Sequence, residues 1–487
     1  MYTWFIFAAL RVALVFAPQT GYIHPDEFFQ ATEIASGDIF GYKTYRSWEF
    51  SDEKPLRSAA VIHLVYGLPL FLLRLVVGTS PSPYLLLVVP RFFICLLSFI
   101  CDYALYRACK RRTGDSHRCL LQLATSYVVL VFHTRTFSNS VESCLLALLF
   151  LPISSKNALS LSAIIVFGFF NRPTFLIWAF PVVASRLTKE RILALIPTCF
   201  IFTVSFILAD TFYYRPESFG EIVTSVLSMN LPASAVITPL NFISYNLNSS
   251  NLESHGVHPR WLHIIVNMPM LFNVAGIVSL WTAAKILISR SRGSDTDKIA
   301  AQTLVLSLVI FSLFCHQEAR FLVPLTVPVT LLSYRTVSTN KLLALIWAAA
   351  NIIFLAFFGF IHQGGVVPCI MKLHSMHFTD TCQPRHIVFA HTYMPPRHLL
   401  SIQDTCKEVV VTDLGGEFPS ESLLSNSPEI IFVAPAWAQP SRMQKLFECA
   451  PHWSGEHLSD GVLQLYSLQV WQAEPQTLLY NKTASAS

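Results

Sequence analysis

The sequence predicts a polytopic, all-α membrane protein that carries a small α/β or mixed-sheet domain at its C-terminal end. Of its 487 residues, 53% are hydrophobic and only 13% are charged, about half the charged share of a soluble protein. Apolar runs of spanning or near-spanning length follow one another as far as residue 361. The net charge is only +5, and the basic residues sit in short loops between these runs. They therefore report membrane topology and give no sign of nucleic-acid binding.

Eleven apolar runs define the membrane part. They cover residues 1–17, 58–78, 84–107, 119–133, 138–153, 158–184, 192–210, 261–285, 299–315, 320–335 and 341–361. The first run has no cleavage site before Pro18, so we expect a retained first span. Eleven simple crossings from a cytoplasmic N-terminus would place the basic loop at Lys110 on the far side, against the positive-inside rule. Agreement returns if residues 58–78 lie in the membrane interface or re-enter it, and if the run 158–184 breaks near Arg172.

This topology gathers the polar loops on one side, the lumenal side. It predicts a transmembrane domain over residues 1–361, with a large first lumenal loop at 18–83, and a lumenal soluble domain over 362–487. Two N-x-S/T sequons, at Asn248 and Asn481, fall on the same side, so glycosylation is permitted at both.

Short β-rich runs alternate with polar stretches in the C-terminal region, at residues 386–390, 409–412, 430–434 and 462–468. This pattern predicts a small mixed sheet. Four of the eleven cysteines also fall there, namely Cys369, Cys382, Cys406 and Cys449. In an extracytoplasmic compartment we expect one or two disulfides among them, and the sequence leaves the pairing open.

Two adjacent carboxylates, Asp26 and Glu27, stand just beyond the first apolar run. Pro25 suits the first position of a helix, so both acids fall in its first turn, where the helix dipole favours negative charge. At helical spacing Asp26 shares a polar face with Gln30 and Glu33, whereas Glu27 lies on an apolar face. Asp26 is therefore predicted to face a hydrated cavity. A solvated helix cap is the alternative.

Charged side chains at the ends of apolar runs are further candidates, because charge at membrane depth is costly. Arg172, between two apolar half-helices, either binds a phosphate or extends to the interface. His316, Glu318 and Arg320 lie between two spans, where a structural ion pair of Glu318 with Arg320 is the alternative.

The loop segment that ends at His258 and Arg260 brings further basic side chains to the lumenal mouth of a span. We expect phosphate or sugar contacts there in preference to a metal site, since no carboxylate accompanies them. Trp48 and Glu49 in the first loop offer an aromatic surface and a charge suited to a sugar, although tryptophan is also a common membrane-interface anchor. Arg135 borders the next lumenal turn.

An enzyme that uses a membrane-bound sugar donor needs a base for the acceptor hydroxyl, cations for the departing phosphate and a path for the lipid. Asp26 is the predicted base. The predicted phosphate-binding residues are Arg260, His258, His316, Arg320 and Arg172. The apolar spans would flank the lipid.

Five motifs follow one another along the chain: His24-Pro25-Asp26-Glu27, Trp48-Glu49-Phe50, Thr134-Arg135-Thr136-Phe137-Ser138-Asn139, Arg172-Pro173-Thr174 and His316-Gln317-Glu318-Ala319-Arg320-Phe321. Together they resemble the motifs of the family-22 glycosyltransferases of GT-C architecture. The resemblance covers roughly residues 15 to 330 and implies a mannosyltransferase of the endoplasmic reticulum membrane that uses dolichyl-phosphate mannose. It places the catalytic acid pair on Asp26 and Glu27, with an inverting single displacement. We expect sugar or acceptor contacts from His24, Trp48, Glu49, Arg135 and Glu318.

Within that family, segments such as His255-Gly256-Val257-His258-Pro259-Arg260 resemble the branch that acts on the glycosylphosphatidylinositol (GPI) precursor. The resemblance implies addition of a fourth, α1,2-linked mannose to the third mannose. A sister enzyme acting on dolichol-linked oligosaccharide or on an earlier GPI intermediate is the nearest alternative. A lipid transporter or scramblase, which inverted repeats and mid-span charges would indicate, is less favoured. The first loop has no DxD pair, so no metal cofactor is expected and transfer should survive EDTA.

Overall fold

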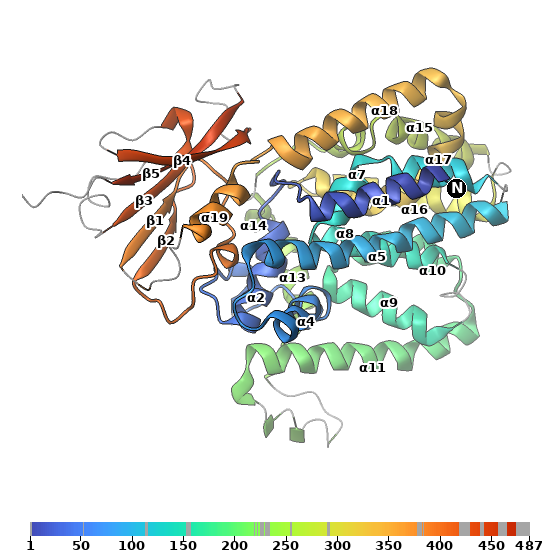
Figure 1. Cartoon of the computed structure of the whole chain (residues 1–487). Coiled ribbons are helices and arrows are strands. Elements are labelled where there is room, and N and C mark those ends of the chain that lie inside the picture. Colours follow the sequence, from blue (N-terminus) through green and yellow to red (C-terminus); the bar gives the residue numbers. More distant parts are fainter. Residues whose placement is uncertain are drawn as a thin grey trace, which may run out of the picture.

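A bundle of helices and a five-stranded sheet beside one of its ends make up the molecule (Figure 1). The computed structural model describes residues 2–473 except 52, 113–114, 152–156, 219, 222, 225–227, 229–233, 254–255, 290–292, 377–381, 383, 418–428, 439–442 and 456–464. Asn481, the second predicted glycosylation site, lies outside the described residues.

Helices form most of the described chain up to residue 375. The α-helices are α1 (Tyr2–Phe16), α2 (Glu33–Phe40), α3 (Ala59–Ile62), α4 (Leu68–Val77), α5 (Pro83–Arg112), α6 (Ser116–Ala124), α7 (Tyr127–Val131), α8 (Ser138–Phe150), α9 (Ala158–Asn171), α10 (Phe175–Ala184), α11 (Lys189–Tyr214), α13 (Thr238–Leu247), α14 (Ser249–Glu253), α15 (Met268–Ser289), α16 (Asp295–Ser312), α17 (Thr326–Thr339), α18 (Lys341–Ala356) and α19 (Val366–Ser375). Wider π-helical turns occur at Phe28–Thr32, His63–Gly67, His263–Asn267 and Phe357–Ile361, and 3-10 turns at Trp48–Phe50, Phe132–Thr134, Pro216–Ser218, Ala319–Leu325, Arg397–Leu400 and Ala436–Ala438.

The helical part is that of a multispan membrane protein. Among the described residues, six stretches are long and apolar enough to cross a bilayer: Ala59–Val77, Pro83–Lys110, Lys189–Tyr214, His263–Ser289, Ala319–Thr339 and Lys341–Ile361. Four shorter apolar helices accompany them, at Tyr2–Phe16, Ser138–Phe150, Ala158–Asn171 and Phe175–Ala184. Every predicted apolar run therefore contains helix, although some of these helices are shorter than a full span.

The predicted break in the run 158–184 is confirmed. Helix α9 ends at Asn171, and α10 begins at Phe175. Arg172 adopts an extended conformation, with φ −156° and ψ 126°, as expected for a residue before proline, whose ring disfavours the helical region at that position. The turn thus presents the Arg172 side chain between two helix ends.

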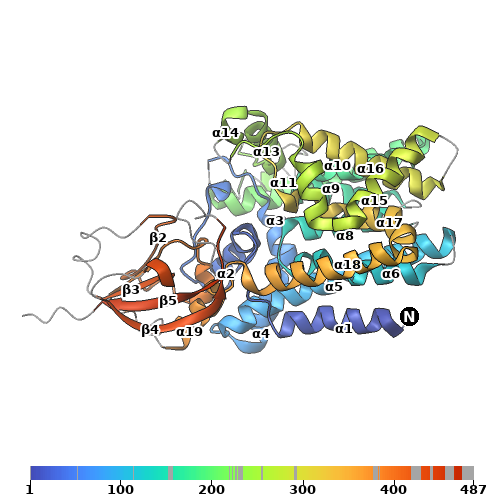
Figure 2. The ribbon, with the colours of Figure 1, turned by 90° about the horizontal axis from the view of Figure 1, so that it is seen from above.

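The run predicted to lie in the interface, 58–78, folds as α3, a π-helical turn and α4. It lies at the end of the bundle that carries the sheet, beside α2 (Figures 1 and 2). Its α4 exposes large apolar side chains, among them Phe71, Leu75 and Val76. An apolar face open to the surroundings suits contact with lipid, and the interfacial location stays a prediction.

The sheet has the strand order β2-β1-β3-β5-β4. Its strands are β1 (Arg385–Phe389), β2 (Val409–Asp413), β3 (Ile430–Pro435), β4 (Met443–His452) and β5 (Tyr466–Ala473). Strand β1 pairs in parallel with β2 and β3, whereas β5 pairs antiparallel with β3 and β4. The mixed sheet is confirmed. The sequence pattern missed β4 and placed the last strand too early, while the division of the chain after residue 361 stays a prediction.

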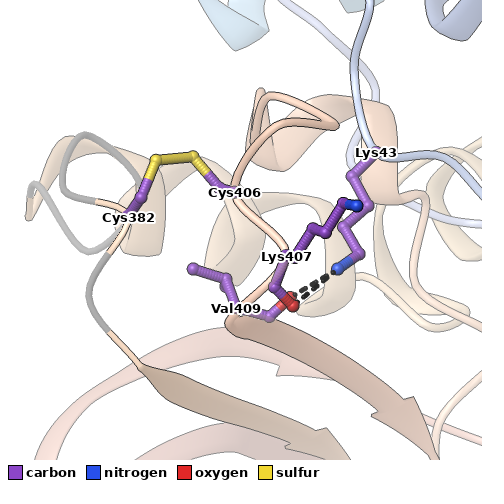
Figure 3. The surroundings of a disulfide bond; sticks show 5 residues. All are labelled: Lys43, Cys382, Cys406, Lys407 and Val409. Carbon is purple, nitrogen blue, oxygen red and sulfur yellow. Dashed lines mark hydrogen bonds between the residues drawn. A yellow bond between two sulfur atoms is a disulfide. The ribbon is translucent and has the colours of Figure 1, made fainter.

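The C-terminal region is attached to the first loop of the bundle. Lys43 Nζ donates hydrogen bonds to the carbonyl oxygens of Lys407 (3.3 Å) and Val409 (3.0 Å), and a disulfide between Cys382 and Cys406 lies next to them (Figure 3). Backbone bonds add to this contact, such as Lys43 N to the Ile402 carbonyl oxygen at 2.7 Å. Residues 41–43 and 402–409 therefore form one continuous contact.

Candidate active site

A cavity of about 460 Å³ lies between four separate segments of the chain. The first loop, the turn between α9 and α10, the α13–α14 region and residues 316–321 all line it. The lining side chains are His24, Asp26, Gln30, Trp48, Glu49, Leu56, Arg57, Arg172, Phe242, Tyr245, Asn246, Leu252, His316, Glu318, Arg320 and Phe321. Its volume suits a small polar ligand such as a sugar with its phosphate.

Asp26 points into this cavity from the turn that Pro25 begins. Its Oδ2 accepts hydrogen bonds from Arg320 Nη1 and Gln30 Nε2, both at 2.5 Å, and its Oδ1 lies 3.3 Å from His24 Nδ1. Burial alone would raise the pKa of the Asp26 carboxyl, but the Arg320 guanidinium and His24 hold that pKa well below its ordinary value. Asp26 is therefore ionised and surrounded by donors.

His316, Glu318 and Arg320 supply the part of the cavity wall next to Asp26. Arg320 also pairs with Glu318, and His316 Nε2 lies 2.7 Å from Glu318 Oε1. His24 Nε2 lies 3.5 Å from the other oxygen of Glu318. Burial opposes ionisation of Glu318, but Arg320 and His24 hold its pKa well below the usual value. The predicted Glu318–Arg320 ion pair is thus present, and it belongs to a network that includes Asp26.

Gln30 joins this network to the second half of the first loop. Besides its bond to Asp26, Gln30 Nε2 donates to Glu49 Oε2 at 2.9 Å, and Glu49 Oε1 accepts from Arg57 Nε (2.9 Å) and Nη2 (2.8 Å). Asp26 and Glu49 are therefore held by one amide group. Arg57 places a second guanidinium at the cavity wall.

Glu27 has quite different surroundings. It is fully buried and is absent from the cavity lining. Arg91 Nε and Arg135 Nη1 donate to its two carboxylate oxygens at 2.8 and 2.9 Å, and Thr136 Oγ1 donates to its backbone carbonyl oxygen at 2.5 Å. Arg135 is likewise buried at this ion pair, away from the cavity lining where we expected it to contact sugar.

Arg172 is the third guanidinium at the cavity wall. Its Nη1 donates to Ser138 Oγ at 3.3 Å, and the guanidinium lies 5.2 Å from the centroid of the Phe321 ring. The side chain is buried, and its Nε has no hydrogen-bond partner in the described part of the chain. A buried N–H group without a partner is costly unless a ligand accepts from it, so this side chain has the capacity to bind an anion.

The structure does not place the other two predicted phosphate-binding residues at the cavity. Arg260 is exposed and donates through Nη1 to the carbonyl oxygen of Leu313. His258 Nδ1 accepts from the Gln317 amide at 3.2 Å, and its ring centroid lies 5.6 Å from that of His316. His258 therefore contacts the 316–321 segment at Gln317 and His316. Neither His258 nor Arg260 lines the cavity.

Aromatic rings form one side of the cavity. Trp48 is about half exposed, and its ring centroid lies 4.8 Å from that of Tyr245, with the planes tilted by 34°. Phe242 and Phe321 add two further rings to the lining. Tilted and stacked aromatic faces suit the C–H surface of a sugar ring, with Glu49 beside them as an acceptor for hydroxyl groups.

Several site residues were not found from the sequence. The sequence predicts for Gln30 only that it shares a polar face with Asp26, and it assigns no role to Arg57 or Tyr245. Arg91, the partner of Glu27, carries the clearest missed signal, since it is a charge within the apolar run 84–107. No group of three or more metal-ligating side chains occurs among the described residues.

The chain belongs to the Alg9-like mannosyltransferase family, whose model matches residues 2–400. It is therefore a glycosyltransferase of the mannosyltransferase class. It is 35% identical to "GPI alpha-1,2-mannosyltransferase 4" of Homo sapiens over 472 residues, covering 85% of this chain and 78% of that protein. It is 32% identical to "GPI mannosyltransferase 4" of Drosophila melanogaster, with 82% of this chain and 72% of that protein covered.

The fold is also found in a solved structure. ArnT from Cupriavidus metallidurans, crystallised with undecaprenyl phosphate, aligns with 97% of this chain and 99% of its own at a TM-score of 0.51 and 10% sequence identity. At this identity the likeness concerns the fold alone, and it supports the predicted GT-C architecture.

Proposed function

We propose that this protein is an α1,2-mannosyltransferase of GPI-anchor biosynthesis in the endoplasmic reticulum membrane, with its active site on the lumenal side. It would transfer mannose from dolichyl-phosphate mannose to the third mannose of the GPI precursor. One observation carries the proposal: in a mannosyltransferase, the ionised Asp26 and three guanidinium groups, those of Arg57, Arg172 and Arg320, meet in one cavity. The names of the relatives support the acceptor.

In this proposal Asp26 is the base. An inverting transfer requires the acceptor hydroxyl to attack the anomeric carbon from the face opposite the phosphate, while a carboxylate takes the hydroxyl proton. Asp26 is ionised because Arg320 and His24 stabilise its charge. When the donor phosphate binds nearby, it would share the positive charge of Arg320, and the pKa of Asp26 would rise toward that of an effective base.

The cations at the cavity wall would stabilise the departing phosphate. Charge develops on that phosphate as the glycosidic bond breaks, and preorganised guanidinium groups in a site shielded from water stabilise it strongly. Arg172 and Arg320, with His316, are the described residues that we assign to this role. Glu27 is assigned a positioning role, since its two arginine partners hold the turn that carries Asp26.

The test is transfer by the purified full-length protein from dolichyl-phosphate mannose to a three-mannose GPI acceptor. A four-mannose product with a new α1,2 linkage is the expected result. A dolichol-linked oligosaccharide and a two-mannose GPI serve as competing acceptors. Transfer to one of these in place of the three-mannose GPI would show that the acceptor assignment is wrong, and absence of transfer to all three would overturn the proposed function.

A further inference from the structure

Two cysteines of the C-terminal region, apart from the Cys382–Cys406 pair, lie against each other. Cys369 is buried on α19, and Cys449 is half-buried on β4. Both are free thiols, and their side chains lie close enough for each to shift the pKa of the other, although the two residues are far apart in the sequence. Nothing in the proposed reaction uses either of them.

The backbone brings these thiols together. Cys369 Sγ lies 3.8 Å from the carbonyl oxygen of Leu468, and Leu468 is the residue that pairs with Cys449 across strands β4 and β5. Gly365, the residue just before α19, comes so close to the same strands that an added Cβ would lie 3.0 Å from the Cys449 carbonyl oxygen and 2.7 Å from Leu468 Cβ. The start of α19 therefore packs closely against strands β4 and β5 at Cys449 and Leu468.

We propose that Cys369 and Cys449 are joined by a second disulfide, which encloses the Cys382–Cys406 disulfide within its loop. The bond requires an oxidising compartment. The Cys382–Cys406 disulfide in the same region already points to one, so the proposal depends on the location of this region and not on which sugar is transferred.

The two thiols differ in the way that disulfide formation requires. The hydrogen bond from Cys369 lowers the pKa of the Cys449 thiol, against the effect of burial, and the nearby Lys372 adds to the lowering. Burial raises the pKa of the Cys369 thiol. Cys449 is thus the more acidic and the more accessible of the two, and it is the attacking thiolate.

The oxidant is an oxidised dithiol oxidoreductase of the same compartment. The Cys449 thiolate attacks one sulfur of that protein's disulfide and forms a mixed disulfide, releasing one oxidoreductase thiol. The Cys369 sulfur, after losing its proton, then attacks Cys449 Sγ and releases the second oxidoreductase thiol. Two S–H bonds are lost and one S–S bond forms in this chain, while two electrons and two protons reduce the oxidoreductase.

The bond would fix the sheet to the bundle at a particular place. Helix α19 follows the last apolar helix after a short turn, and β4 is the edge strand of the sheet. A covalent link between them would hold this edge strand against the helix that leads out of the bundle. The Cys382–Cys406 disulfide lies at the other side of the sheet, beside β2 and Lys43 (Figure 3).

Peptide mapping of the full-length protein tests the proposal. The protein is purified from membranes without reductant, denatured in N-ethylmaleimide, treated with a glycosidase to remove N-glycans, and digested with trypsin. Cleavage after lysine and arginine separates the four C-terminal cysteines into peptides 342–372, 373–385, 398–407 and 446–482. We expect peptides 342–372 and 446–482 joined, with a mass lower by two hydrogens than their sum, and split by reductant.

Maleimide on both Cys369 and Cys449 in this sample, or either of them joined to a different cysteine, would overturn the proposal. Cys315, a half-buried free cysteine in another tryptic peptide, is the internal control and should be alkylated in every sample. In a Cys369→Ser variant we expect alkylation of Cys449 to rise from almost none to nearly complete, and an unchanged level would contradict the pairing. The mapping needs no sugar transfer, so its outcome is separate from that of the function.

Discussion

Asp26 and Glu27 are adjacent in the sequence and have opposite surroundings. Asp26 lies in the cavity with Arg320 and Gln30, whereas Glu27 is fully buried between Arg91 and Arg135. A resemblance that assigns both acids to catalysis does not separate these two positions. Their hydrogen-bond partners distinguish the two positions, so the two carboxylates should respond differently to the same kind of substitution.

Asp26→Asn should abolish most of the transfer and leave the fold intact. The amide oxygen can still accept a hydrogen bond from Arg320, but it cannot take a proton from the acceptor, and loss of a general base lowers kcat by roughly 10²- to 10⁴-fold. Steady-state transfer assays at matched folded concentration measure this. Near-normal kcat in the variant would exclude Asp26 as the base.

Glu27→Gln should act mainly on stability. Breaking a buried ion pair by removing one partner costs about 3–5 kcal/mol, because the remaining charges stay buried without compensation. We expect a lower thermal unfolding temperature and a lower yield of folded protein, with kcat of the folded fraction within tenfold of the wild type. A variant that unfolds like the wild type and yet transfers no mannose would contradict the positioning role.

Arg172 and Arg260 allow a matched comparison of two arginine substitutions, one inside the cavity and one outside it. Arg172→Met should raise the KM for the lipid donor by roughly 10- to 100-fold, equivalent to the 1.5–3 kcal/mol of a hydrogen bond to a charged group. Arg260→Met is the control, because the exposed Arg260 side chain bonds only a backbone carbonyl among its described contacts. Donor titrations compare the two variants. If Arg260→Met had the larger effect, the donor phosphate would lie outside this cavity.

Asp26 was predictable from the sequence because Pro25 fixes the start of its turn and helical spacing places Gln30 beside it. The same spacing also placed Glu33 on the polar face of Asp26, and this prediction is wrong. The chain forms a π-helical turn at Phe28–Thr32, which adds a residue to the turn, and Glu33 bonds away from the cavity to His398 instead. Spacing along one segment also says nothing of contacts between distant segments, so Arg57 and Arg91 could not be placed.

The buried pair Glu33–His398 joins α2 to the C-terminal region. Both side chains are fully buried, and Glu33 Oε2 lies 2.6 Å from His398 Nδ1 and accepts the His398 backbone amide at 3.1 Å. Its other oxygen accepts the Tyr45 amide at 3.0 Å. The segment that carries Asp26 and Gln30 is thus held from the side opposite the cavity.

His398→Ala should destabilise both α2 and the segment around residue 398. Without the imidazole, Glu33 is left as a buried carboxylate with fewer donors, which is costly. We expect faster amide hydrogen exchange over residues 33–45 and 398–407 together, with unchanged exchange in α16, which packs on α10, α15 and α17. Lys407→Gln is the matched control, since only the backbone of Lys407 contacts Lys43. Faster exchange confined to residues 398–407 would show that the two elements are not coupled.

The division of the molecule into a helical membrane part and a sheet was predictable from composition, because long apolar runs admit only helices in a membrane and short β-rich runs predict strands. Strand β4 was missed because its residues are mostly polar or half-exposed, as an edge strand permits. The contact of the sheet with the first loop depends on backbone bonds such as that of Lys43 with Ile402. No pattern within either segment specifies that contact.

Acid should weaken the attachment of the sheet to the bundle through His452. This side chain is fully buried, its Nδ1 accepts the Gly365 amide at 3.3 Å, and burial lowers its pKa to about 3. An unfolded histidine titrates near 6.5, so the stability that the neutral ring contributes is complete above that pH. It is lost as the pH falls toward 3, by about 1.4 kcal/mol per pH unit.

Thermal unfolding measured from pH 7.5 to 5.0 tests this. The unfolding midpoint should fall with pH in the wild type and fall less steeply in His452→Asn, because the Asn oxygen can accept the same amide hydrogen bond and gains no proton. The exposed His117→Gln should keep the wild-type slope, and an unaltered slope in His452→Asn would place the acid sensitivity elsewhere.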